Sequence, residues 1–144
     1  MERFDYPVLL KAAKEGGFIV TCRDLPSLIT QGEDKADALS QAADAMDEVF
    51  ATYMLEGIIF PTPGKRRRGE YSIAPPAETM AKAALYIAMS EAGITKVQLA
   101  KQLGVDEKEV RRLLDPHYAS KLPRIAQAIQ LLGRRLVIGL EVVK

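Results

Sequence analysis

The sequence has few of the residues that build disulfide or metal-bound frameworks. Its 144 residues include one cysteine, Cys22, and one histidine, His117. A single cysteine excludes an internal disulfide framework, and one histidine without a cysteine cluster cannot supply the usual ligands of a zinc site. Cys22 lies in a strand-like apolar run, where we expect it to be a small buried hydrophobic side chain.

Long hydrophobic runs are also absent. No segment approaches the roughly 18 consecutive apolar residues from which a membrane-spanning helix is predicted. The acidic residues Glu2 and Asp5 stand where a signal peptide would lead into an apolar stretch. We therefore expect a cytoplasmic protein that does not insert into a membrane.

Net charge is nearly absent from the whole chain but not from its parts. Residues 1–60 hold 5 Lys/Arg and 11 Asp/Glu, a net of −6, whereas residues 61–144 hold 15 and 8, a net of +7. The length and the hydrophobic content of 48% suffice for one ordinary domain or two small ones. Because the halves carry opposite charge, we expect two domains with different partners, at residues 1–74 and 75–144.

The first half has the pattern of an antiparallel sheet. Two apolar runs, 6–13 and 18–22, are separated by a turn that contains Gly16 and Gly17, and paired glycines favour a tight hairpin. Short strands are also expected at 28–30 and 71–73. Between them the apolar period becomes helical from about Asp34 to Glu56. These elements predict an α+β domain with the order β-β-β-α-β and one helix packed on the sheet.

The same helix has an acidic outer side. Asp37, Asp44 and Glu48 fall opposite its apolar stripe, and Asp24 lies in the preceding loop. Their acidity suits either a basic protein partner or a solvated face, and we name the four residues as candidate partner contacts. The basic run Lys65 to Arg68 is interpreted as a solvated connection or as a phosphate-contacting arm.

The second half contains a helix-turn-helix pattern. Thr95 with Gln98, and Asp106 with Glu109, each have the spacing of a helix-capping box, and Gly104 separates the two short helices. An ordinary helical hairpin is the alternative, but the caps, the turn and the apolar spacing agree. We predict a DNA-binding unit in which phosphate contacts come from lysines and base contacts mainly from Arg111 and Arg112. The full candidate DNA-binding set is Lys96, Lys101, Glu107, Lys108, Arg111, Arg112 and Lys121.

The chain ends in an almost unbroken apolar run, residues 136–143, which follows a further helix at about 122–132. A run of this length predicts a buried strand. Pairing it across a two-fold axis would form a dimer, with tetramers left open, and would present two reading helices to DNA. The candidate dimerisation residues are Leu136, Ile138, Leu140 and Val142.

The order of these parts resembles the HicB antitoxins of bacterial type II toxin-antitoxin systems. The resemblance covers nearly the whole chain and rests on the segments 15–18 (EGGF), 24–26 (DLP) and 30–32 (TQG), an Ala-rich helix and the helix-turn-helix. It implies that the N-terminal domain is a degraded ribonuclease H fold that covers a HicA-type toxin, a small basic ribonuclease that cleaves messenger RNA. It also implies that the C-terminal domain represses the operon. The chain departs from the usual pattern at Lys96, where Gln is common, and at the acidic Glu107 and Glu109.

Two other functions remain as alternatives. In an enzyme, Asp24, Asp44, Asp47 and Glu48 would gather into a metal-binding carboxylate site. We expect neither catalytic residues, a metal nor a cofactor, because three of these carboxylates share one helix and no cofactor loop is recognisable in residues 1–60. A ligand-sensing transcriptional repressor would use its first domain to bind a small molecule. A neighbouring reading frame that encodes a small basic protein with one key histidine would favour the antitoxin.

Overall fold

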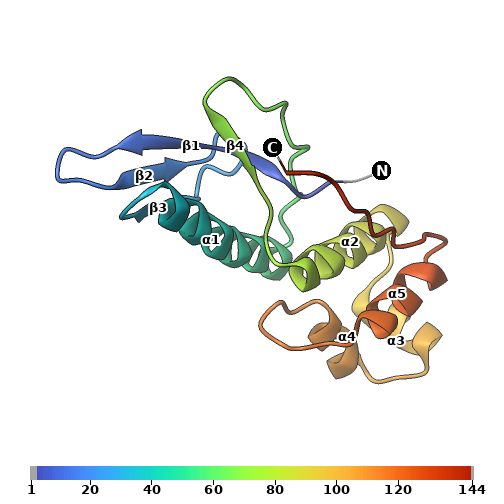
Figure 1. The fold of residues 1–144 in the computed structure, drawn as a ribbon. Helices are drawn as coiled ribbons and strands as arrows, with labels where there is room; N and C mark the ends of the chain where they lie inside the picture. The colour runs from blue at the N-terminus through green and yellow to red at the C-terminus, as the bar shows by residue number, and fades with distance from the viewer. Residues whose placement is uncertain (1–2, 144) are drawn as a thin grey trace. The chain divides into compact units, whose positions relative to one another are not determined.

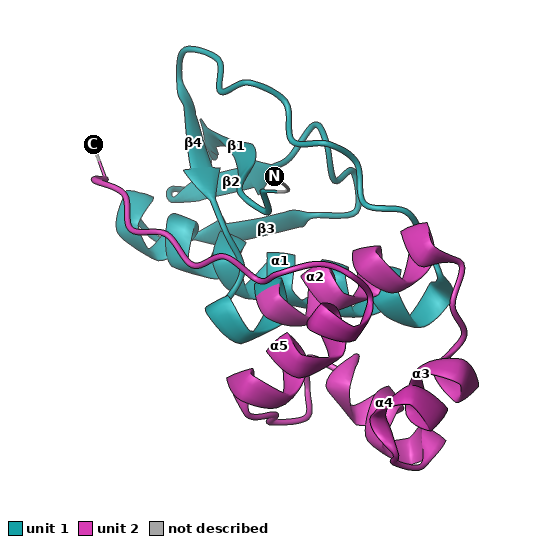
Figure 2. Cartoon of the chain, turned by 90° about the vertical axis from the view of Figure 1, so that its right-hand side faces the viewer, with its two compact units in different colours: residues 1–80 teal, residues 81–144 magenta. Residues whose placement is uncertain are grey.

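The computed structural model describes residues 3–143, so Glu2, mentioned above, lies outside the described residues. The chain divides into two compact units, residues 1–80 and 81–144, which Figure 2 distinguishes by colour. The division falls within α2 (Ala77–Ala92). The predicted α+β class is confirmed, because a four-stranded sheet with a packed helix precedes a helical region.

The first unit is an antiparallel sheet with a helix on one face (Figure 1). Its strands are β1 (Tyr6–Ala12), β2 (Phe18–Thr21), β3 (Ile29–Gly32) and β4 (Glu70–Ile73). The strand order is β3-β2-β1-β4, with Leu10 opposite Val20 and Tyr6 opposite Ile73. Gly16 and Gly17 in the β1–β2 turn both have positive φ, as the paired-glycine prediction requires. The predicted order β-β-β-α-β is confirmed.

The helix α1 (Lys35–Glu56) covers the sheet and contacts all four strands. It begins where the Asp34 side chain accepts a hydrogen bond from the Asp37 amide and ends at Gly57, which adopts φ 72°. Its buried residues include Ala38, Met46 and Met54. The buried stripe thus follows the expected period, although Leu39 and Tyr53, which that period also favours, are only half-buried. Cys22 is buried in the same unit, as predicted.

A close approach explains the TQG segment that precedes α1. A Cβ atom built on Gly32 would lie 2.3 Å from the Ala38 nitrogen and 2.4 Å from the Ala38 Cα, both of which are backbone atoms. Ala38 itself is fully buried. The end of β3 and the first turn of α1 therefore fit together only because residue 32 has no side chain.

We expect Gly32→Ala to lower the free energy of unfolding by about 1–3 kcal/mol, the usual cost of forcing an extra carbon into a packed contact. Urea unfolding followed by circular dichroism would measure the change. Gly139→Ala is the matched control, because a Cβ there meets no atom within 4 Å and the residue has no positive φ. Equal stability of the two variants would contradict the steric explanation.

The second unit is helical. It contains most of α2, followed by α3 (Lys96–Leu103), α4 (Glu107–Leu113) and α5 (Leu122–Leu131). Its core joins apolar side chains from all four helices, among them Leu85, Leu99, Val110 and Ile125, each fully buried. Within the described residues, we find no helix whose length and hydropathy would allow it to cross a membrane.

The predicted C-terminal strand is not observed. Residues 134–143 follow α5 with no helix or strand (Figure 2). Leu136 packs against the core of the second unit, whereas Ile138, Leu140 and Val142 are 74%, 102% and 85% exposed. A strand is defined by hydrogen bonds to a second strand. The single chain supplies none here, so the apolar pattern alone could not produce one.

Candidate functional sites

The helix-turn-helix element forms as its capping residues predict. Thr95 and Gln98 make a reciprocal capping box at the start of α3, with the Thr95 hydroxyl accepting from the Gln98 amide at 3.1 Å. The Asp106 carboxylate accepts from the Glu109 amide at 3.0 Å and starts α4. Gly104, at φ 70°, makes the turn between the helices. Apart from Val97, which is exposed, the apolar side chains of both helices join the core, and the polar sides of the helices face solvent.

Most of the candidate DNA-binding side chains are exposed. Lys96 and Lys101 lie on α3, Lys108 and Arg111 lie on α4, and Lys121 immediately precedes α5. The other two candidates, Glu107 and Arg112, also lie on α4, where Glu107 is exposed and Arg112 half-buried. The unit that carries them, residues 81–144, has 11 Lys/Arg and 6 Asp/Glu, a net of +5.

The two arginines of α4 are in different environments. Arg111 Nε lies 3.9 Å from Glu107 Oε1, and its side chain is 60% exposed. Arg112 Nη1 donates to Glu109 Oε1 at 2.9 Å, and its guanidinium carbon lies 5.0 Å from the centre of the Tyr118 ring. A stacked and ion-paired guanidinium samples fewer conformations than an exposed one. Arg112 is therefore held in place, whereas Arg111 can move.

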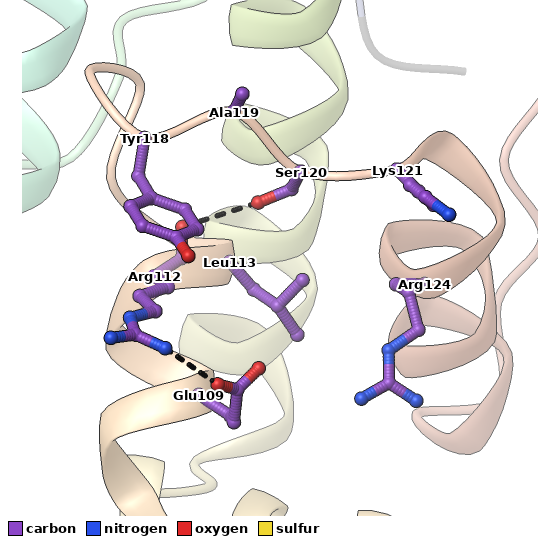
Figure 3. A pocket seen from close by; sticks show the side chains of 8 residues that line it. All are labelled: Glu109, Arg112, Leu113, Tyr118, Ala119, Ser120, Lys121 and Arg124. Carbon is purple, nitrogen blue, oxygen red and sulfur yellow. Dashed lines mark hydrogen bonds and ion pairs between the residues drawn. The ribbon is translucent and has the colours of Figure 1, made fainter.

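A small cavity of about 140 Å³ lies beside Arg112, between α4, the loop that follows it and the start of α5 (Figure 3). Its charged lining residues are Glu109, Arg112, Lys121 and Arg124. The lining carries a net charge of +2, and its one carboxylate is already paired with Arg112. This arrangement suits an anion such as a phosphate group. Arg124 was not among the residues predicted from the sequence, because its place opposite α4 depends on the fold.

A buried lysine bonds to three of the residues that line this cavity and was also missed from the sequence. Lys82, on α2, is 0% exposed. Its ammonium donates to the carbonyl oxygens of Arg112 at 3.0 Å and Asp115 at 2.7 Å, to the Ser120 hydroxyl at 2.9 Å, and to the Tyr118 carbonyl oxygen. The only signal in the sequence is that Lys82 stands among the small apolar residues of the inward side of α2.

On the first unit, the structure separates the four acidic candidates into two kinds. Asp44 and Glu48 are exposed on α1. Asp24 accepts a hydrogen bond from the Gly64 amide at 2.9 Å, and Asp37 accepts one from the Glu33 amide at 2.8 Å. Asp24 and Asp37 therefore already serve the fold, Asp24 by fixing a loop and Asp37 by bonding the backbone just before α1.

An exposed leucine continues the acidic side of α1. Residues 44, 48 and 55 lie within about 40° of one another around the helix, since each residue advances it by about 100°. Leu55 is 85% exposed, and Ile59, just beyond the helix end, is 81% exposed. We call Asp44, Glu48, Leu55 and Ile59 the α1 surface. It combines negative charge with apolar area, which is the composition of many protein-binding sites.

The basic run Lys65 to Arg68 belongs to a loop whose backbone is anchored. Arg23 forms two hydrogen bonds with the Glu70 carboxylate, at 3.0 and 3.1 Å, and another with the Lys65 carbonyl oxygen. The Glu70 carboxylate also accepts from the Arg67 amide at 2.7 Å. The bonds from Arg23 and from the Arg67 amide lower the pKa of Glu70. This segment is thus a fixed loop with exposed basic side chains.

Among the described residues, the carboxylates do not form a metal site. Within residues 3–143, no three side chains of His, Cys, Asp or Glu lie close enough together to hold a metal ion. Asp47, the acidic residue nearest the apolar edge of α1, instead accepts a hydrogen bond from the Thr79 hydroxyl. The arrangement on which the enzyme alternative depends is therefore not found in this part of the chain.

Comparison with known proteins agrees with the resemblance seen in the sequence. A family model described as HicB_like antitoxin of bacterial toxin-antitoxin system matches residues 5–84. Antitoxin HicB of Escherichia coli (strain K12) is 34% identical over 131 residues, which cover 91% of this chain and 95% of that protein. Antitoxin HicB of Pseudomonas fluorescens (strain Pf0-1) is 31% identical over 140 residues, covering 96% and 94%. Antitoxin HicB 1 of Photorhabdus laumondii is 29% identical over 136 residues, covering 94% and 86%. Since the family model matches more than half of the chain and these relatives align over nearly all of it, the chain belongs to the HicB-like antitoxin family.

Proposed function

We propose that this antitoxin binds and neutralises a HicA-type, messenger-RNA-cleaving toxin and represses its own operon by binding operator DNA. The observation that carries the proposal is its membership of the antitoxin family over nearly the full length of the relatives. The opposite charges of the two units support different partners for them, a basic toxin for the first and DNA for the second. Residues 1–80 hold 9 Lys/Arg and 13 Asp/Glu, a net of −4, against +5 for residues 81–144. The protein acts by binding and uses neither a metal nor a cofactor.

The toxin-binding role is assigned to the domain of residues 1–74 and, within it, to the α1 surface. A ribonuclease uses positive charge to hold phosphates, so a negative surface steers the antitoxin towards it and accelerates association. Leu55 and Ile59 supply the apolar area that holds the complex together after encounter. Asp24 and Asp37 contribute mainly by shaping the loop and the start of α1, because their carboxylates already accept backbone hydrogen bonds.

The DNA-binding role is assigned to the domain of residues 75–144. Helix α4 is proposed to lie in the major groove, with Arg111 and Arg112 reading base edges. Lys96, Lys101, Lys108 and Lys121 contact phosphates, and Arg124 joins them beside the cavity of Figure 3. Glu107 and Glu109 hold the two arginines. A dimer formed through Leu136, Ile138, Leu140 and Val142 presents two copies of α4 to a palindromic site.

We expect replacement of both arginines of α4, Arg111→Ala with Arg112→Ala, to weaken binding to the promoter of the chain's own operon. Each bidentate base contact contributes about 1–3 kcal/mol, so even one lost contact lowers the affinity about tenfold. A mobility-shift titration at fixed salt concentration would measure the effect.

The control replaces Lys14 by Gln in the β1–β2 turn, which removes a positive charge from an exposed site outside α4. Its affinity should match that of the parent chain. Unchanged promoter binding in the double arginine variant would refute the assignment of α4 as the reading helix.

A further inference from the structure

The buried ammonium of Lys82 holds two residues that also contact each other. The Arg112 guanidinium stacks on the Tyr118 ring at 5.0 Å, and the carbonyl oxygens of both residues accept hydrogen bonds from Lys82 Nζ. The ammonium also holds Asp115 and Ser120, on either side of Tyr118 in the chain. One side chain inside the unit thus fixes the end of α4, the following loop and the stacked pair on the outer side.

A simpler means of ending a helix exists in this same chain. Gly57 and Gly104 close α1 and α3 in the left-handed conformation, where a backbone amide satisfies the last carbonyls. Helix α4 has no glycine at its end, and Leu114 stays in the right-handed region. Burying an ammonium costs free energy unless its N–H groups are all bonded. A lysine is therefore not needed merely to end the helix stably. Its bonds have the further effect of holding the end of α4 and the following loop in one conformation.

We propose that Lys82 is a positioning residue for sequence-specific DNA binding, an inference that rests on the function proposed above. It acts through Arg112. By fixing the main chain of both Arg112 and Tyr118, it holds the guanidinium at the place where α4 meets the base edges. A contact whose geometry is set before binding costs less to form, and specificity depends on that geometry. Non-specific attraction to phosphates depends on charge and does not require it.

The test is a double-mutant cycle on the full chain with Lys82→Met and Arg112→Ala. Affinities are measured by fluorescence anisotropy on a labelled duplex from the chain's own promoter region and on an unrelated duplex of equal length. All titrations are made well below the unfolding transition, with the active fraction fixed by stoichiometric titration. Ile129→Val is the control, because Ile129 is a core residue of the same unit and its carbonyl oxygen accepts from Leu132 and Arg134, outside the 112–120 segment.

We expect Lys82→Met to lower affinity for the promoter duplex about tenfold, the value of one base contact, and to leave the unrelated duplex unchanged. In the Arg112→Ala background, Lys82→Met should have no further effect, because residues that act through one another are not additive. Additive losses, equal losses on both duplexes, or a similar loss in Ile129→Val would overturn the proposal.

If Lys82→Met does not fold, Ser120→Ala replaces it, since that change leaves the lysine and removes one acceptor of its ammonium, together with the 3.5 Å bond from the Ser120 hydroxyl to the Arg112 carbonyl oxygen. We then expect a smaller loss on the promoter duplex that is again absent in the Arg112→Ala background, and unchanged affinity would overturn the proposal. Equal affinity of the parent chain for the two duplexes would contradict the proposed sequence-specific DNA binding itself, and therefore also this inference.

Discussion

Deletion of residues 136–144 is expected to convert the protein to monomers and to abolish tight promoter binding in the same step. The deleted segment contains the exposed Ile138, Leu140 and Val142. In a dimer, strand pairing would bury these side chains and satisfy their backbone groups. A monomer presents one copy of α4, so it loses the second half-site and, with it, most of the specific binding free energy. Analytical ultracentrifugation and a mobility shift on the same sample would measure both changes.

A second variant tests the same segment without shortening the chain, by making two of its apolar side chains polar. Leu140→Ser with Val142→Ser leaves the backbone intact and removes two strongly exposed apolar side chains. It should weaken the dimer without altering the unfolding of the helical core, because neither side chain belongs to that core. A truncated protein that still sediments as a dimer would show that another surface holds the protomers together.

Replacement of Leu55 by Ser on the α1 surface is expected to accelerate dissociation of the toxin. A central apolar anchor at a protein interface typically contributes about 2 kcal/mol or more, which corresponds to roughly 30-fold in affinity. The charge reversal Asp44→Lys with Glu48→Lys should instead slow association by about tenfold or more at low salt, because steering is lost. Surface plasmon resonance with immobilised toxin would separate the two rate effects.

Leu55 lies on an exposed position, so Leu55→Ser should leave the free energy of unfolding unchanged. Ile29→Ser offers a matched control, since Ile29 is 68% exposed on the edge strand β3 rather than on α1. If Leu55→Ser and the parent chain bind and release the toxin at equal rates, the toxin-binding site does not include this end of α1.

The fold could be predicted from the sequence where local chemistry determines it. Paired glycines fixed the β1–β2 turn, Thr95 and Asp106 fixed the starts of α3 and α4, and Gly104 fixed the turn between them. Each of these signals concerns residues within a few positions of one another. The strand predicted over 136–143 failed for the opposite reason, because pairing depends on a second strand that periodicity does not identify.

Contacts between residues far apart in the chain could not be predicted from the sequence for the same reason. Lys82 is bonded to residues 30 to 38 positions later, and Arg23 to a glutamate 47 positions later. The exposure of Leu55 could not be predicted, because its neighbours in the sequence are also apolar. Only the packing of α1 shows which side of the helix faces the sheet. The charge pattern also did not predict that the carboxylates of Asp24 and Asp37 accept hydrogen bonds from backbone amides.

The most direct test of the proposed toxin-binding role separates neutralisation from DNA binding. Residues 1–80 are co-expressed with the toxin of the neighbouring reading frame, a boundary chosen to retain the bond from Thr79 to Asp47. Circular dichroism first establishes that the fragment is folded. We expect the fragment to restore growth and to bind the purified toxin in calorimetry although it lacks α3 and α4. A folded fragment that neither restores growth nor binds the toxin would contradict the proposed role.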